Sequence, residues 1–174
     1  MIVIGLSFSL IIVSMSGFPF YTMHFVKKNT QSRVLRLSIR SIKVTDAKPV
    51  ELVGANDLYC QIECGTIRYR TPTLDNTGAN GDWDLGHAGD NASGLFREEE
   101  AKALKMKFEL WDENTTRSNT KIGVSEPIDM SKLVDCINDV RAFSFNVQDS
   151  KGKISGKVMV MAVLTPHVSH NSMT

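Results

Sequence analysis

Apolar and polar residues alternate along most of the chain after residue 33, which is the pattern of half-buried β-strands. The clearest run is residues 104–110, where Leu, Met, Phe and Leu share one parity and charged residues take the other. Similar alternation predicts further strands at residues 33–44, 57–64, 67–71, 124–128, 143–147 and 154–164. Short strands separated by turn residues are typical of a sandwich, so the sequence predicts an all-β fold of about seven or eight strands.

The alternation is interrupted at several places, and each interruption carries an expectation. In the first strand the apolar parity switches between Ile39 and Ile42, which predicts a β-bulge near residues 40–41. Residues 75–96 concentrate Gly, Asn and Asp and are expected to form a long loop. A helical turn or two and a short helix are expected in two connections, at residues 97–105 and 129–136.

The first 28 residues form a hydrophobic segment outside the predicted sandwich. No Asp, Glu, Lys or Arg occurs from Ile2 to Val26, a run long enough to cross a bilayer as a helix. Two lysines follow directly, and the positive-inside tendency would then leave the rest of the chain in the cytosol. We favour a signal-anchor. A signal peptide with a small-residue cleavage site, or a true start at Met15 or Met23, is also compatible with this run.

Composition limits the classes of function. The 174 residues are enough for one domain with a real core, which the pattern places at residues 31–167, before a disordered tail at residues 168–174. The net charge of +1 gives no global field that would favour nucleic acid, so any basic patch must be local. Three cysteines at irregular spacing do not make a disulfide framework, and they fit a reducing compartment.

The central strand ends in oxygen-bearing side chains. Asp112 and Asn114 alternate along the backbone, so both side chains can point to one side of the loop that follows. Calcium takes six to eight oxygen ligands, which carboxylates and amides supply. Acidic and amide residues also suit ordinary turns, so on its own this run favours a turn over a cation site.

Three segments in the same order resemble the C2 domain, a β-sandwich module that binds lipid and calcium in many signalling and trafficking proteins. Residues 112–123 keep the spacing of the family's Asp-rich loop, although two of its three carboxylates are gone. Residues 51–59 match a second calcium loop in spacing, and residues 152–160 resemble the last turn and strand. The resemblance implies an antiparallel eight-stranded C2-type β-sandwich, here preceded by an N-terminal hydrophobic helix.

The resemblance also implies a site for Ca²⁺ at one end of the sandwich. The matching positions are Glu51, Asp57, Asp112, Asn114 and Thr120. They supply three carboxylates where the family has five. Because calcium affinity rises with the number of carboxylates, the sequence predicts weak calcium binding or none.

Basic side chains form a second candidate site, for anionic phospholipid. They share a face on each of three predicted strands, as the pairs Arg36 and Arg40, Arg68 and Arg70, and Lys105 and Lys107. If these strands lie in one sheet, their outward side is a basic surface with few acidic partners. Each basic residue near an anionic leaflet adds about 1 kcal/mol, and many C2 domains use such a face for phosphoinositides. Arg and Lys are also ordinary on the solvent side of a sandwich.

Zinc and catalytic chemistry have little support in the sequence. Cys60 and Cys64 would lie about 13 Å apart on one strand, too far to share a zinc ion, and are interpreted as buried thiols. No histidine has an Asp or Cys partner at a spacing that suggests a catalytic triad. We therefore predict that the chain is not an enzyme.

The sequence predicts a peripheral membrane-binding module, calcium-independent or weakly calcium-dependent, that acts in signalling or trafficking. Anionic phospholipid is the expected partner, with a protein as a further one and no nucleic acid, and the domain is expected to be membrane-associated and to face the cytoplasm. The alternative is a protein-interaction or scaffold domain that has lost the lipid and calcium chemistry. A clustered basic face would favour the first hypothesis, and basic residues paired with carboxylates would favour the second.

Overall fold

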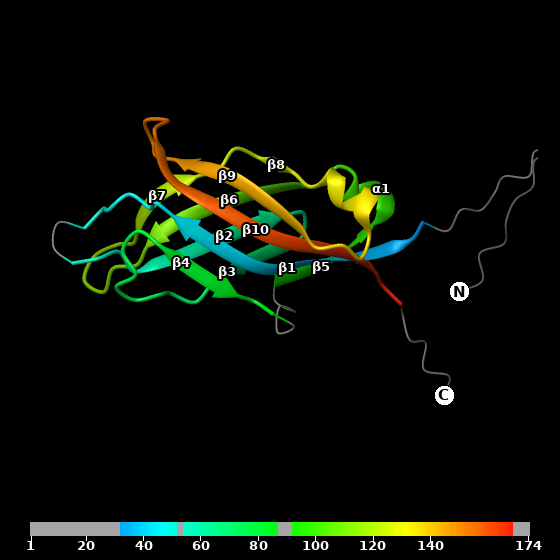
Figure 1. The fold of residues 1–174 in the computed structure, drawn as a ribbon, viewed down its shortest axis with the longest axis horizontal. Coiled ribbons are helices and arrows are strands. Elements are labelled where there is room, and N and C mark those ends of the chain that lie inside the picture. Colours follow the sequence, from blue (N-terminus) through cyan, green and yellow to red (C-terminus); the bar gives the residue numbers. More distant parts are fainter. Residues whose placement is uncertain (1–31, 52–53, 87–91, 169–174) are drawn as a thin grey trace, which may run out of the picture. The chain divides into compact units, whose positions relative to one another are not determined.

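The computed structural model describes residues 32–51, 54–86 and 92–168, which belong to one compact unit, and Figure 1 shows that this unit is mainly β-strand. The described helices are short, α1 (Glu98–Ala101) and the 3-10 helix η2 (Ser131–Cys136). The strands are β1 (Val34–Thr45), β2 (Leu58–Cys64), β3 (Ile67–Arg70), β4 (Gly81–Asp84), β5 (Ser93–Arg97), β6 (Lys105–Asp112), β7 (Thr120–Val124), β8 (Ile128–Asp129), β9 (Arg141–Gln148) and β10 (Ile154–Pro166).

The strands hydrogen-bond in the order β3-β2-β6-β7-β9-β10-β1-β4, and every pairing between them is antiparallel. Two positions on this path are shared. β4 pairs with residues 41–44 of β1 and β5 with residues 34–38, so the two short strands lie end to end along β1. β7 and β8 pair in the same way with β6. The described strands therefore fill eight positions, which confirms the predicted eight-stranded antiparallel sandwich.

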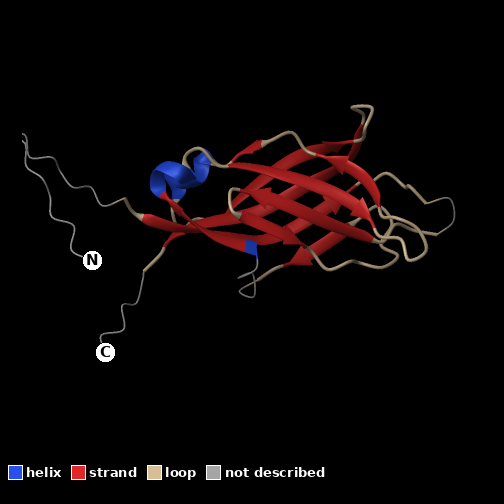
Figure 2. Cartoon of the chain, turned by 180° about the vertical axis from the view of Figure 1, so that it is seen from behind, coloured by secondary structure: helices blue, strands red, loops and turns tan. Residues whose placement is uncertain are grey.

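The path curls so that its two halves pack against each other (Figure 2). We call β3, β2, β6, β7 and β8 the first layer, and β9, β10, β1, β4 and β5 the second layer. The layers are joined through one paired position, Val124 of β7 with Gln148 of β9. Leu37 of the second layer and Phe108 of the first belong to one buried core, and both side chains are 0% exposed. The apolar parity predicted for residues 104–110 is the parity that faces this core.

The structure confirms some of the predicted irregularities and corrects one. The register of β1 shifts between Ile39 and Ser41, which is the predicted β-bulge. The long loop predicted at residues 75–96 is wrong in part, because the region contains β4 and most of β5. Both strands are only four or five residues long, so they lack the extended alternation that would have revealed them among Gly and Asp. The helical segments predicted at residues 97–105 and 129–136 correspond to α1 and η2.

The hydrophobic helix predicted at residues 1–28 lies outside the described residues, and so do residues 169–174 of the predicted tail. Val168, the last residue described, is 70% exposed. In the part of the chain that the structure describes, no helix combines the length and the hydrophobicity needed to span a membrane.

Four connections meet at one end of the sandwich, which we call the loop end (left in Figure 1). They are the first loop (residues 46–57, described except for 52–53), the second loop (71–80), the third loop (113–119) and the β9–β10 turn (149–153). Backbone hydrogen bonds tie them together, from Gly78 N–H to Asn56 O (3.2 Å), Glu113 N–H to Asp57 O (2.8 Å) and Lys48 N–H to Ser155 O (2.8 Å).

The join between the layers leaves no room for a side chain at Gly123 of β7, which is buried. A Cβ at this position would overlap the Ser155 hydroxyl and lie 3.1 Å from the Gln148 carbonyl oxygen. Because overpacking a buried site costs about 1–3 kcal/mol, we expect Gly123→Ala to lower the free energy of unfolding by that amount in urea denaturation. Adding Ser155→Ala removes the hydroxyl and should recover part of the loss. A double variant whose loss equals the sum of the single losses would contradict this overlap.

Candidate functional site

The loop end is built on a buried carboxylate, Asp112, the last residue of β6. Its side chain is 0% exposed, and its Oδ1 accepts the backbone N–H of Asp57 at 2.8 Å. No described donor contacts its Oδ2. Burial raises the pKa of this carboxyl above the ordinary 3.8, because removal from water disfavours the charged form. Asp112 therefore ties β6 to the start of β2 at an electrostatic cost.

Two asparagines close the loops on either side of Asp112. Asn56 of the first loop is 2% exposed and donates from Nδ2 to the carbonyl oxygens of Lys48 (3.1 Å) and Gly78 (3.2 Å). Asn114 of the third loop donates from Nδ2 to the Thr120 hydroxyl at 3.3 Å. The first asparagine holds the first loop against the second, and the other closes the neck of the third loop.

A basic side chain, Arg117, lies among these loops. Arg117 of the third loop donates from Nε to Asn114 Oδ1 at 2.7 Å, and its Nη2 lies 3.7 Å from Glu51 Oε1 of the first loop. Its charge also acts to lower the pKa of Asp112, against the larger opposing effect of burial. Arg117, Asn114, Glu51 and Asp57 line an open cavity of about 380 Å³. The guanidinium thus supplies positive charge between the carboxylates of the two loops.

All the residues predicted as calcium ligands lie at the loop end, but at different depths. Glu51, Asp57 and Asn114 line the cavity, whereas Asp112 is buried and Thr120 accepts a hydrogen bond from Asn114. Among residues 32–51, 54–86 and 92–168, no group of three or more His, Cys, Asp or Glu side chains is arranged to hold a metal ion. Calcium needs six to eight oxygens, and here a guanidinium already pairs with one carboxylate. Their role as ligands stays a prediction.

The basic residues predicted on the first layer are paired with carboxylates. The sequence shows few acidic residues on these strand faces, but β8 and the start of the third loop supply two more. The pairs are Arg68 with Glu63, Arg70 with Glu113 (2.9 Å), Lys105 with Asp129 (3.3 Å) and Lys107 with Glu109 (2.8 Å). Exposed ion pairs add little to stability, but each reduces the attraction of its cation for an anionic surface.

Arg36 and Arg40 lie on β1 in the second layer, so they do not share a surface with the basic residues of the first layer. The Nη1 of Arg40 donates to the carbonyl oxygen of Gly86 at 3.1 Å. The condition for one basic surface across all three strands is therefore not met, because the curl of the sheet carries β1 into the opposite layer. A lipid-binding role for any of these residues individually stays a prediction.

Two aromatic rings on the first layer hold cations, a feature that sequence reasoning missed. Tyr59 and Trp111 are cross-strand partners, and their rings stack with centroids 6.1 Å apart. The guanidinium of Arg70 lies 3.9 Å from the Tyr59 centroid, and the ammonium of Lys121 lies 4.6 Å from that of Trp111. Only the register between β2 and β6 brings the two rings together.

Two of the three cysteines behave as core residues, and the third, Cys136, is only partly buried. Cys60 and Cys64 are free thiols, buried at 0% and 1% exposure, as predicted. Burial raises the pKa of Cys64 to about 11 and raises that of Cys60 well above 9.0, so neither thiol ionises readily near neutral pH.

The prediction that the chain is not an enzyme remains a prediction.

Comparisons with known proteins show similarity in structure only. No family model and no curated protein matches the chain. A C2 domain of plant extended synaptotagmin 1 aligns with a TM-score of 0.57 at 14% identity, over 79% of this chain and 98% of that one. Human GIVD cytosolic phospholipase A2 aligns with a TM-score of 0.61 at 15% identity, over 78% of this chain and 17% of that one. Calcium-bound extended synaptotagmin 2 aligns with a TM-score of 0.53 at 18% identity, over 76% and 45%.

These likenesses confirm the predicted C2-type sandwich. Identities of 14–18% show the fold and leave the chemistry of the loops to be argued from the residues themselves. The chain spans nearly the whole of the plant C2 domain but only 17% of the phospholipase, so the likeness to that enzyme transfers no activity.

Replacing Arg117 by aspartate should create calcium dependence. Arg117→Asp removes the internal cation and adds a carboxylate beside Glu51 and Asn114, and more carboxylates raise calcium affinity. Calcium at about ten times the Kd would then stabilise the fold by about 1.4 kcal/mol. We expect a rise in Tm of about 3–6 °C on addition of calcium. The unmodified chain and Lys132→Asp, on η2, should show no rise; an equal rise in all three would contradict the role of Arg117.

Asp112 should make stability depend on pH. Because its pKa in the folded state is raised, the folded state binds the proton more tightly than the unfolded state, so the stabilising effect of protonation is lost as the pH rises above about 4. Asp112→Asn keeps an oxygen for the Asp57 N–H and removes the buried charge. In chelator at pH 7 we expect it to raise the free energy of unfolding by about 1 kcal/mol, with the difference shrinking on acidification. If Asp112→Asn were less stable than the unmodified chain at pH 7, the burial of this carboxylate could not carry an electrostatic cost.

Proposed function

We propose that this chain, which has the fold of a C2 domain, is a peripheral membrane-binding module that docks without calcium and acts in signalling or trafficking. The fold supports the membrane-binding part of the proposal, since the similar structures include C2 domains of two extended synaptotagmins. The contacts of Arg117 with Glu51 and Asn114 support calcium independence.

The reason for calcium independence is electrostatic. A divalent cation bound between acidic loops neutralises their charge and orders them. In this chain the number of carboxylates at the matching positions is lower, and Arg117 supplies a positive charge between the first and third loops. Asn56, Asn114 and the Asp112–Asp57 hydrogen bond already order those loops without an ion. The loop end is therefore expected to keep its structure in the absence of calcium.

The proposed location is a membrane surface, with the domain facing the cytoplasm. This part rests on the sequence, in which two lysines follow the uncharged segment from Ile2 to Val26. The free, buried thiols Cys60 and Cys64 are compatible with a reducing compartment.

A protein-interaction domain is the second candidate function. The observation that favours it is the pairing of basic side chains with carboxylates across the first layer. A surface of alternating charge with little net sign suits a protein partner of complementary pattern better than a uniformly negative bilayer. In this case lipid vesicles would not retain the domain.

Flotation of residues 32–174 with lipid vesicles separates these functions. These residues form a compact unit with its own core. Vesicles of neutral lipid and of neutral lipid with about 30 mol% anionic lipid would each be used with calcium and with chelator. We expect binding to the anionic vesicles in chelator, weakened by salt because the attraction is electrostatic. Binding that requires calcium would overturn the proposed calcium independence, and binding to neither vesicle would favour the protein partner.

A further inference from the structure

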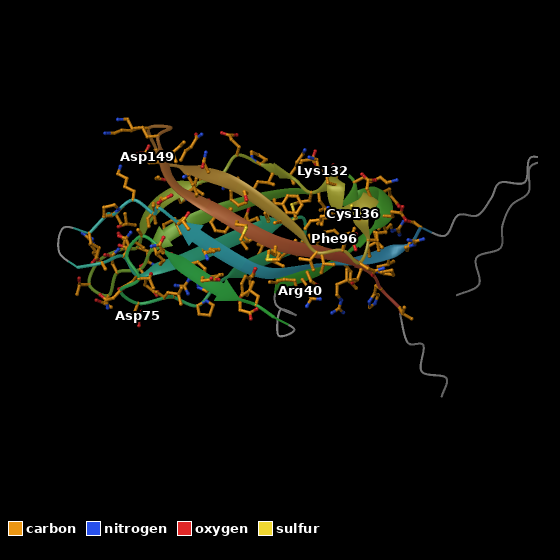
Figure 3. The ribbon with its side chains drawn as sticks, viewed as in Figure 1. Arg40, Asp75, Phe96, Lys132, Cys136 and Asp149 are labelled. Carbon is orange, nitrogen blue, oxygen red and sulfur yellow. The ribbon has the colours of Figure 1, made fainter. Side chains whose placement is uncertain are left out.

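The β9–β10 turn carries the basic charge that the first layer does not offer. Lys151 and Lys153 are exposed, and no ion pair to either is found among the described residues. We use the name lysine turn for residues 149–154 together with the neighbouring Lys48 and Lys157. Figure 3 labels Asp149 at the loop end, where nitrogen-bearing side chains project from the turn.

Hydrogen bonds to Asp149 hold the conformation of the lysine turn and occupy its carboxylate. The Oδ1 of Asp149 accepts the backbone N–H groups of Lys151 (2.9 Å) and Lys153 (3.1 Å), and its Oδ2 accepts from Lys48 Nζ (3.2 Å). These hydrogen bonds lower the pKa of Asp149. Gly152 has a φ of +75°, and a Cβ there would meet nothing within 4 Å, so the turn projects into open space. The hydrogen bonds of Asp149 fix the backbone of the turn, and the side chains of Lys151 and Lys153 stay exposed.

The charges around the turn add up to a local excess. Three lysines of this region pair with carboxylates, namely Lys43 with Asp82 (3.8 Å), Lys48 with Asp149 (3.2 Å) and Lys157 with Asp46 (3.4 Å). Lys151 and Lys153 add two further positive charges with no such partner among the described residues. This differs from the first layer, where each of the four predicted lipid-binding residues has a carboxylate partner.

An exposed aliphatic side chain stands next to these charges. Ile154, the first residue of β10, is 61% exposed, the largest exposure among the large hydrophobic residues of the strands. Lys153 precedes it directly, and Lys157 follows on the same strand. An apolar side chain beside lysines matches the membrane interface, where apolar groups enter the acyl boundary and ammonium groups stay at the phosphates. A nucleic acid would use the lysines but has no comparable place for an isoleucine at the edge of the patch.

We propose that the lysine turn is the surface by which the domain docks on an anionic membrane, with Lys151 and Lys153 at the lipid headgroups and Ile154 at the acyl boundary. The inference rests on the proposed function and adds to it an orientation, with the β9–β10 turn and the first residue of β10 towards the bilayer. Neither the lysines of the turn nor Ile154 belongs to the basic set predicted from the sequence.

The test compares two variants of residues 32–174, the compact unit, that each remove two lysines spaced two residues apart. Lys151→Ala with Lys153→Ala removes the unpaired charges, and Lys105→Ala with Lys107→Ala removes paired charges on the first layer. A lysine near an anionic surface contributes about fivefold in affinity, so the turn variant should bind vesicles of phosphatidylcholine with about 30 mol% phosphatidylserine about 25-fold more weakly. The matched control should change by less than about twofold. Vesicles of phosphatidylcholine alone serve as the neutral reference, and leaving out residues 1–31 removes any contribution of the uncharged segment, Lys27 and Lys28.

A second variant reports the position of the turn directly. Ile154→Trp places a fluorophore at the exposed site, and its emission, after subtraction of the unmodified chain, should shift to the blue on anionic vesicles and be quenched by brominated acyl chains. The Lys151 and Lys153 variant and the Ile154→Trp variant change exposed side chains only, so we expect their Tm to equal that of the unmodified chain. An equal Tm would exclude loss of the fold as the cause of weaker binding.

The outcomes separate the inference from the proposed function. The lysine turn would be ruled out as the docking surface if the Lys151 and Lys153 variant bound as tightly as the unmodified chain. The same would follow if the emission of the Ile154→Trp variant did not shift on vesicles that bind the chain. Membrane binding itself would stand in both cases. A greater loss in the Lys105 and Lys107 variant would do the same and return the site to the first layer. If the unmodified chain binds anionic vesicles no better than neutral ones, the proposed function itself fails.

Discussion

The loop end depends on one buried hydrogen-bond acceptor, the carboxyl group of Asp112. It lies at the end of the central strand, where it accepts the N–H of Asp57 and so fixes the start of β2 against the end of β6. A buried carboxylate with an unpaired oxygen is costly unless positive charge or further donors compensate it. Arg117 acts in that direction from within the third loop. The proposed calcium independence rests on this arrangement, in which a guanidinium of the chain supplies positive charge near the buried carboxyl group.

The distribution of charge over the surface matters more than its total. A net charge of +1 hides two different surfaces, a first layer where cations alternate with carboxylates and a projecting turn where two lysines have no such partner among the described residues. Paired charges cancel within a few ångströms, so their field fades quickly from the surface. In the proposed docking mode, the two lysines of the projecting turn meet the lipid headgroups first. This difference is what links the geometry of the β9–β10 turn to the proposed mode of docking.

The prediction of strands succeeded where a strand is long and has one wet face. β6 and β2 alternate over seven or eight residues, and the parity of each identifies the buried side. The bulge in β1 was visible because a register shift must exchange the apolar parity. β4 and β5 were missed because each is short and gains its strand conformation from pairing with β1, a partner more than 35 residues away for every pair. Propensity within such a segment carries little of that information.

The sequence by itself determined the all-β sandwich and the spacing of the loop residues, because alternation and turn composition are local properties. It also placed the residues of the loop end in the right order along the chain. Only the tertiary structure decided which charges are compensated. Lys105 meets Asp129 across the β6–β8 pairing, Arg70 of β3 meets Glu113 of the third loop, and Arg117 reaches Glu51 between two loops. The interaction of charges depends on distance through space, and neighbouring strands bring together residues that are far apart in the chain. The sheet's curl, which separates Arg36 and Arg40 from the other basic residues, is likewise a property of the whole fold.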